Sequence, residues 1–344
     1  MIDSVIQSVS AALFETPLYN PFVTSQGCAH VARAVVVEIR LADGTVCRGE
    51  SVPVQYVTGE TIESVLDICT QVAPLLVGTD VRQFRQPLTV LAPLVSTSPS
   101  ARCGLEMAIL KGFSHATGTT LHQLCGAALG SMHTDITIPI VPNAGELTEL
   151  AWATGMRVFK IKVGDPDRSA DLARVSAIRA AAPQARIRID ANQAFTPQEA
   201  LDFVTNLVED GAQIDLLEQP VPSRDFEGLA WVAERSPVPV FADESCITPA
   251  NALKLVNTAV HGLNLKINKN GIFGVLDIIA IAKAANRKLM LGCMLETRYS
   301  IAQSLAIACG TGAFDFLDLD SHLLLNEPAN DSLFSQIGPE LILP

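Results

Sequence analysis

The 344-residue sequence predicts an α/β protein made of a small N-terminal α+β unit followed by a closed parallel barrel. Three observations support this prediction. The first third of the chain combines a β-hairpin pattern with helical stretches. After about residue 130, short apolar strands alternate with helical segments rich in Ala and Leu. Lysines and acidic residues recur where those strands end.

The N-terminal unit begins with a hairpin. Residues 31–41 are rich in β-branched side chains, Asp43 and Gly44 form a turn, and residues 45–49 resume the strand. From residue 61 to about residue 126 the pattern becomes helical, as in the spacing of Ile62, Val65 and Cys69. The stretch 101–116 also predicts a helix. We therefore assign residues 1–127 to an α+β domain.

Eight short apolar segments are predicted as the strands of the barrel. They occupy residues 136–141, 158–163, 187–191, 215–219, 238–242, 263–267, 288–292 and 314–319. They lie roughly 20 to 28 residues apart, which is the spacing of βα units. An open doubly wound sheet would require a Gly-rich phosphate turn after its first strand, and the sequence has none. The barrel is assigned to residues 128–320, and residues 321–344 form a C-terminal segment.

Composition excludes several classes of partner. The net charge of -12 and the lack of basic runs argue against nucleic acid and against an anionic membrane surface. No apolar stretch reaches membrane-spanning length, and the N-terminal stretch lacks the layout of a secretion signal. We expect a cytoplasmic protein. The eight cysteines and six histidines are scattered singly, which predicts buried free thiols and no zinc site.

Two lysines, Lys160 and Lys162, flank Ile161 in the second predicted strand. Alternation places both ammonium groups on one face of the strand. Two ammonium groups this close disfavour each other's charged form, which would help one of them act as a base near neutrality. Taken alone, the pair is more often a solvated sheet edge.

Acidic residues close the next three strands, and these change the interpretation. Asp190, Glu218 and Asp243 end the third, fourth and fifth strands, and Lys266 lies on the sixth. Chemistry in a parallel barrel gathers at these strand ends. Three carboxylates on one side of the mouth suit Mg²⁺. One acidic strand end is usually a helix cap or a solvated turn, but three in succession between lysines are poorly explained that way.

Lys162 and Lys266 lie on opposite flanks of the three carboxylates. This layout suits proton abstraction next to a carboxylate that is held on the metal, since the cation and a nearby ammonium stabilise the enediolate. A base on each face allows removal from one side and delivery from the other, which inverts the stereocentre. The arrangement favours racemisation or epimerisation.

The sequence resembles the enolase superfamily, in its muconate-lactonising-enzyme subgroup, over nearly the whole chain. The motifs are Lys160-x-Lys162, Asp190-x-Asn192, Glu218-Gln219-Pro220, Ala242-Asp243-Glu244-Ser245 and Leu265-Lys266-x-Asn268-Lys269. The resemblance implies a capping domain, a modified TIM barrel of the (β/α)7β type and a C-terminal segment that returns to the cap. It also implies a homo-oligomer, since oligomers are common among such proteins.

The resemblance also implies a role for each motif residue. The implied set is Mg²⁺ on Asp190, Glu218 and Asp243, acid/base roles for Lys162 and Lys266, enolate stabilisation by Lys160, and ligand orientation by Asn192 and Glu244.

Asp318 and Asp320 resemble the DxD signature of the dipeptide epimerases, in which two carboxylates hold the α-ammonium of the N-terminal residue. Strand alternation places both carboxylates on one face, as an anionic clamp across the mouth from the metal. A dipeptide held at both ends would place the α-carbon of its second residue between the two lysine bases. The resemblance further implies that the pocket wall contains Thr137, Cys293, Met294 and Leu295.

One departure from the family concerns the cap loop. Members that act on Ala-Glu carry an arginine a few residues after the Pro-Phe pair, here Pro21 and Phe22. Residues 23–27 of this chain contain no basic side chain. We therefore expect dipeptides with a neutral or hydrophobic second residue, and not Ala-Glu. Glu296, near the end of the seventh strand, would also allow a cationic side chain.

Other functions of the same scaffold remain open at this point. They are N-acylamino acid racemisation, o-succinylbenzoate synthesis and muconate cycloisomerisation. Those substrates have no free α-ammonium and so give no reason for Asp318 and Asp320. An alternative of a different class is a catalytically silent barrel that acts as a binding protein. The presence of all three ligands and both bases argues against it.

Overall fold

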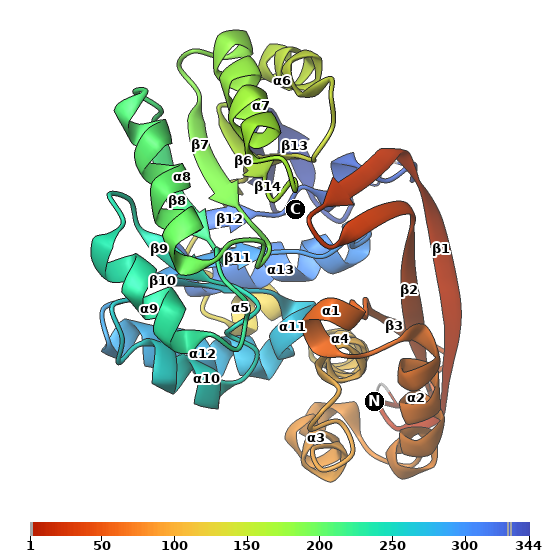
Figure 1. Ribbon diagram of the computed structural model, residues 1–344. Helices are drawn as coiled ribbons and strands as arrows, with labels where there is room; N and C mark the ends of the chain where they lie inside the picture. Colours follow the sequence, from red (N-terminus) through yellow and green to blue (C-terminus); the bar gives the residue numbers. More distant parts are fainter. Residues whose placement is uncertain (1–2, 329, 331) are drawn as a thin grey trace.

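The computed structural model describes residues 3–328, 330 and 332–344 (Figure 1). An antiparallel sheet forms the N-terminal part of the protein. The sheet order is β1-β2-β3, from strands β1 (Ile6–Thr24), β2 (Gly27–Leu41) and β3 (Val46–Ser51). The hairpin that the sequence predicts around Gly44 is confirmed, and this glycine has a φ of 89°. β1 and β2 are much longer than a minimal hairpin, so their connecting turn reaches the mouth of the barrel. Of the N-terminal stretch used to argue against a secretion signal, residues 1–2 lie outside the described residues.

Helices follow this sheet along the chain. They are α1 (Gln55–Thr58), α2 (Ile62–Leu76), η1 (Val81–Gln83), α3 (Arg85–Leu91), α4 (Pro99–Thr117) and α5 (Leu121–Leu124). Of these, α2 and α4 pack against the strands of the sheet. α2 begins with a capping box at Thr61, and its buried residues Ile62, Val65, Cys69 and Val72 recur at helical spacing. This confirms the amphipathic pattern in the sequence.

Eight parallel strands form the second part, and all eight predicted strands are confirmed. They are β5 (Ile136–Ile138), β6 (Val158–Lys162), β7 (Arg186–Asp190), β8 (Ile214–Glu218), β9 (Val240–Ala242), β10 (Gly262–Leu265), β11 (Lys288–Gly292) and β12 (Phe316–Asp318). The surrounding helices are α6 (Ala144–Ala153), α7 (Arg168–Ala181), α8 (Pro197–Glu209), α9 (Phe226–Arg235), α10 (Pro249–Leu255), α11 (Ile267–Asn270), α12 (Ile272–Ala284) and α13 (Arg298–Thr311). The fold is a parallel barrel with an N-terminal α+β domain, as the sequence predicts.

The first and last barrel strands meet along a seam that contains few backbone bonds. Among the described residues, one bridge is found at this seam, between Thr134, just before β5, and Leu317 in β12. Side chains supplement it: the Leu319 amide donates to Thr134 Oγ1 at 2.8 Å, and the Thr137 amide donates to Asp320 Oδ2 at 2.6 Å. A residue of the predicted clamp therefore also closes the barrel.

The barrel interior changes character along its axis. At one end, the side chains of Leu216, Phe241 and Met290 form a separate apolar cluster against Phe316. At the carboxyl ends of the strands, the inward side chains are charged. The larger apolar core lies between the strands and the surrounding helices. The apolar cluster thus forms a floor beneath the charged layer.

Buried carboxylates of the cap join it to the barrel. Glu50 on β3 accepts from the Thr297 amide at 2.9 Å, at the start of α13. Glu106 on α4 accepts from the Ile272 amide at 2.6 Å, at the start of α12. In addition, the Val52 amide donates to Asn268 Oδ1 at 2.8 Å. Each contact satisfies groups that would otherwise be buried without a partner.

The C-terminal segment contributes η2 (Ser321–Leu323), β13 (Ser335–Ile337) and β14 (Glu340–Ile342). β14 pairs with β4 (Ser131–His133). The segment also contacts the cap, because the Asn326 amide donates to the Pro17 carbonyl at 2.8 Å. None of the described helices has the length and apolar composition needed to cross a membrane.

Candidate active site

The predicted site residues come together at the carboxyl ends of the strands. Strand register places Lys162 beside Asp190, and Asp190 beside Glu218, on three neighbouring strands. Asp243 follows β9 directly, and Lys266 follows β10 directly. All five side chains are buried. The parallel register, together with the alternation of side chains along each strand, puts these groups in one layer.

Lys160 lies at the centre of the carboxylates. Its Nζ is 3.0 Å from Asp190 Oδ2, 2.9 Å from Glu218 Oε2 and 2.7 Å from Asp318 Oδ2. Burial alone would lower the pKa of Lys160, but these carboxylates raise it well above the ordinary lysine value. The surrounding carboxylates therefore outweigh the effect of burial and favour the charged form of Lys160.

The two predicted bases each pair with a different carboxylate. Lys162 Nζ is 2.5 Å from Asp190 Oδ2, and Lys266 Nζ is 2.8 Å from Asp243 Oδ2. Asp243 also binds Lys269, whose Nζ is 2.6 Å from Oδ1 and 2.6 Å from the backbone carbonyl. Lys269 belongs to the motif Leu265-Lys266-x-Asn268-Lys269, which by itself indicates no role for it. The structure shows it as an anchor for Asp243.

Amides hold the carboxylates from outside the layer. The Asn192 amide N–H donates to Asp190 Oδ1 at 2.9 Å, and the Asn192 side chain donates to Glu244 Oε1 at 3.2 Å. Asn264 Nδ2 donates to Glu218 Oε1 at 2.7 Å. Asn264 was not anticipated, because a single Asn within an apolar strand gives no signal of what it faces.

Burial and charge act on these carboxylates in opposite directions. Burial raises the pKa of Asp190, but the ammonium groups of Lys160 and Lys162 outweigh it and hold the pKa at about 2. Glu218 differs: its burial, together with the charge of Asp190, raises its pKa to about 8. The raised pKa of Glu218 indicates that the lysines do not fully offset the negative charge of the cluster.

The donor set fits a divalent cation. Six buried carboxylates and four buried lysines form the group, so it carries two surplus negative charges when every member is ionised. The carboxylates are those of Asp190, Glu218, Asp243, Glu244, Asp318 and Asp320, and the lysines are Lys160, Lys162, Lys266 and Lys269. Two buried oxygens beside the proposed ligands, Glu244 Oε2 and Asn192 Oδ1, have no hydrogen-bond partner. Oxygen-rich, negatively charged sites of this kind suit Mg²⁺.

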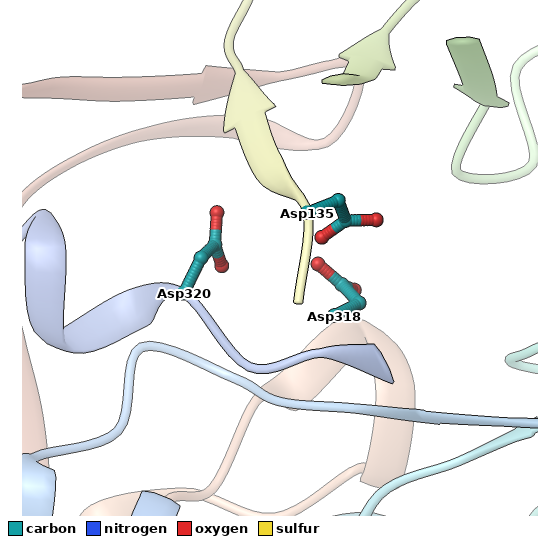
Figure 2. Close-up of side chains that lie close together, drawn as sticks. All are labelled: Asp135, Asp318 and Asp320. Carbon is teal, nitrogen blue, oxygen red and sulfur yellow. The ribbon is translucent and has the colours of Figure 1, made fainter. Parts of the chain in front are cut away.

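A second acidic group lies beside the first. Figure 2 shows Asp135, Asp318 and Asp320, whose carboxylate oxygens lie within 4.8 Å of one another in a geometry that could hold a cation. Sequence reasoning found Asp318 and Asp320 but missed Asp135. Because Asp135 comes immediately before the first barrel strand, it resembles an ordinary polar residue at a strand start.

A chamber of about 330 Å³ opens above this layer, between the cap and the barrel. Its lining includes the predicted wall residues Thr137, Cys293, Met294 and Leu295. Glu296 does not line it. Instead, the fully buried Glu296 carboxylate accepts from the Met294 amide at 2.9 Å and from the Ser300 hydroxyl at 2.5 Å. The expectation that Glu296 could receive a cationic substrate side chain is therefore wrong.

Comparisons with known proteins match this architecture. Residues 8–126 match the mandelate racemase / muconate lactonizing enzyme N-terminal domain, and residues 144–336 match the enolase C-terminal domain-like family. An L-Ala-D/L-Glu epimerase from Thermotoga maritima is 36% identical over 98% of both chains. An aromatic dipeptide epimerase from Herpetosiphon aurantiacus is 34% identical over 99% of this chain and 96% of that one.

A solved structure supports the same assignment. The dipeptide epimerase from Enterococcus faecalis, complexed with Mg and L-Leu-L-Tyr, has a TM-score of 0.93 and 30% identity, and the match covers 99% of this chain and 97% of that one. The resemblance found in the sequence motifs is confirmed. This chain belongs to the enolase superfamily, as an isomerase of its dipeptide epimerase family.

Proposed function

We propose that this protein is a Mg²⁺-dependent dipeptide epimerase that inverts the α-carbon of the second residue by proton transfer between Lys162 and Lys266. The observation that carries the proposal is the placement of these two buried lysines on separate strands, on either side of the carboxylates. Mg complexes with dipeptides in solved relatives support the choice of cofactor and substrate class.

Two groups of side chains would hold the substrate. Asp318 and Asp320 line the chamber and would bind the α-ammonium of the first residue. Asp190, Glu218 and Asp243 would hold Mg²⁺. When bound, the metal would supply a positive charge that stabilises the carboxylate and its enediolate form.

The lysines would divide the proton transfer between them. In the neutral form, one of Lys162 and Lys266 accepts the α-proton. The other, as an ammonium, delivers a proton to the opposite face. Lys160 would stay protonated throughout because its pKa lies well above the ordinary value, and its charge would stabilise the developing enediolate oxygen. Lys160 and Lys162 would thus have separate roles although they share one strand.

The chamber wall supports a neutral or hydrophobic second residue. The cap contributes Phe22, Val54, Tyr56 and Val57 to the lining. Arg33 also lines the chamber, but its Nε is ion-paired to Glu15 at 2.8 Å. Curated relatives act on both types of substrate, because a relative named a hydrophobic dipeptide epimerase is 33% identical and the Thermotoga enzyme is named for Ala-Glu. The lining, and not overall identity, favours the hydrophobic class.

Deuterium exchange tests the proposal directly. A library of L,L-dipeptides is incubated with the protein and Mg²⁺ in deuterated water, and the products are analysed by mass spectrometry. We expect a gain of one mass unit for dipeptides with neutral or hydrophobic second residues. No exchange in any dipeptide, with metal bound, would overturn the proposed function. Equal exchange in Ala-Glu would overturn only the proposed preference.

A further inference from the structure

Asp135 is a fully buried carboxylate that the mechanism above does not use. It precedes β5 by one residue and is two residues from Thr137, so both side chains point into the barrel. Thr137, Asp318 and Asp320 line the chamber, but Asp135 does not. Asp135 therefore lies behind the predicted clamp and can act on a ligand only through its neighbours.

Arg188 anchors Asp135 from across the barrel. This β7 residue donates from Nη1 to Asp135 Oδ2 at 2.6 Å, and from the same nitrogen to the Leu317 carbonyl at 2.6 Å. Leu317 precedes Asp318 directly. One guanidinium therefore fixes both the carboxylate of Asp135 and the backbone beside the clamp, at the seam that is bridged between Thr134 and Leu317.

The other Asp135 oxygen faces the clamp. Asp135 Oδ1 is buried and has no hydrogen-bond partner, and in Figure 2 the carboxylates of Asp135 and Asp318 face each other. Lys160 is the ammonium closest to Asp318, but it is shared with Asp190 and Glu218. Converging carboxylates in a buried site are costly unless a further cation joins them.

We propose that Asp135 is a positioning residue for the substrate: held by Arg188, it supports Asp318 from behind and keeps the clamp placed for a free α-ammonium. This inference rests on the proposed function. A primary ammonium fits better than a second metal ion. A metal needs several oxygens in direct coordination, whereas only Asp318 and Asp320 of these three aspartates line the chamber. An ammonium can be held by those two, with Asp135 fixing Asp318 from behind.

The test compares Asp135→Asn with Asp215→Asn. Asp215 is a matched control because it is also buried and lies 3.8 Å from Nε of the same Arg188, but it does not belong to the cluster in Figure 2. Each variant is assayed with a dipeptide that the unmodified enzyme epimerises. We expect Asp135→Asn to raise KM at least tenfold while kcat changes less than threefold. Asp215→Asn should leave both within threefold.

A second ligand separates this role from a structural one. The des-amino analogue of the same dipeptide lacks the α-ammonium, and its inhibition constant should be the same in Asp135→Asn as in the unmodified enzyme. If Asp135→Asn weakens the binding of both ligands equally, or leaves the KM of the dipeptide unchanged, the inference is overturned. If the Asn variant does not fold, as judged by circular dichroism, Asp135→Ser is used with the same criteria. Absence of any dipeptide turnover in the unmodified enzyme would count against the proposed function instead, and the comparison would then use ligand-induced shifts in Tm.

Discussion

At the scale of single residues, neighbouring side chains with the same chemistry have different surroundings. Lys160 contacts three carboxylates and Lys162 contacts one, although both project from the same face of β6. Asp243 pairs with Lys266 and Lys269. Asp190 pairs instead with Lys160 and Lys162. A residue's role in this site therefore depends on how many charges it shares.

Removing either proposed base should abolish epimerisation and leave the fold intact. Lys162→Ala and Lys266→Ala each delete a side chain that faces the chamber and not the apolar core. We expect exchange of the α-proton to fall by at least about 10³-fold, in the range of a lost general base or acid. The measurement is deuterium incorporation, with circular dichroism as the check on folding. Parent-like turnover in either variant would contradict the two-base mechanism.

Lys269 should contribute to metal affinity without touching the substrate. Lys269→Met keeps the length of the side chain but removes the ammonium that holds Asp243 Oδ1 and the Asp243 carbonyl. Because groups that orient a metal ligand typically contribute about 10- to 100-fold to affinity, we expect Mg²⁺ to bind weaker by that factor. Calorimetric titration with Mg²⁺ provides the measurement. Arg157→Met, far from the ligands, serves as the control, and equal affinities in the two variants would refute the role.

Asp320 distinguishes between the reactions that this scaffold supports. Asp320→Asn keeps an oxygen that can accept from the Thr137 amide but removes the negative charge. We expect dipeptide turnover to fall by about 100-fold, since a charge-assisted bond to the ammonium is lost. Full retention of activity would favour an N-acyl substrate or a cycloisomerase reaction instead.

At the scale of elements, the tip of the β1–β2 hairpin is fastened to the barrel beside the metal ligands. Gln26 Nε2 donates to the Asn192 carbonyl at 2.7 Å, and Ser25 Oγ donates to the Ala191 carbonyl at 3.2 Å. Gly164 makes this approach possible, because a Cβ there would lie 2.7 Å from Ser25 Cβ. The glycine that ends the lysine motif thus has a steric role that its sequence context does not reveal.

Gly164→Ala should therefore loosen the chamber without removing any catalytic group. The added methyl group conflicts with Ala194 Cβ at 2.5 Å as well as with Ser25 Cβ at 2.7 Å, and the φ of 113° at this position is unfavourable for alanine. We expect KM to rise about tenfold or more, because a displaced tip must be reordered on binding. Hydrogen exchange of residues 20–30, with and without dipeptide, reports the tip directly. Gly118→Ala is the matched control, because Gly118 also has a positive φ, of 72°, and a Cβ there meets no atom within 4 Å.

The elements themselves could be predicted far better than their contacts. All eight barrel strands follow from apolar runs bounded by turn signals, and the strand-end charges follow from topology. The seam could not be predicted: Asp135, Arg188 and Leu317 are separated by 53 and 129 residues, and nothing local indicates that they meet. Likewise, Glu296 looked available in sequence because the bonds that occupy it depend on how its loop folds.

At the scale of the whole molecule, the cap and barrel share buried carboxylates, and this couples stability to pH. Burial raises the pKa of Glu50 to about 7, although bonds from Thr297 act in the opposite direction. The folded-state pKa is above the unfolded value, so the folded protein binds the proton more tightly. This contribution is present below about pH 4.5 and is lost as pH rises through about 7.

Glu50→Gln should remove that part of the pH dependence. In the unmodified protein, the loss attributable to Glu50 between pH 4.5 and 8 is on the order of 3 kcal/mol in the free energy of unfolding. The Gln variant should show a correspondingly flatter profile. Urea unfolding across this range, in the presence of a chelator so that metal binding does not contribute, gives the comparison. Parallel profiles for the two proteins would contradict the assignment.

The same shared carboxylates restrict how such enzymes can be recombined. Glu50 and Glu106 belong to the cap, yet they complete the starts of two barrel helices. A chimera that exchanges the entire N-terminal domain with a relative would bring in carboxylates placed for another barrel. Exchanging only the hairpin tip, residues 22–28, leaves both of these contacts in place. Transplanting specificity between relatives should therefore succeed with the short graft and fail with the long one.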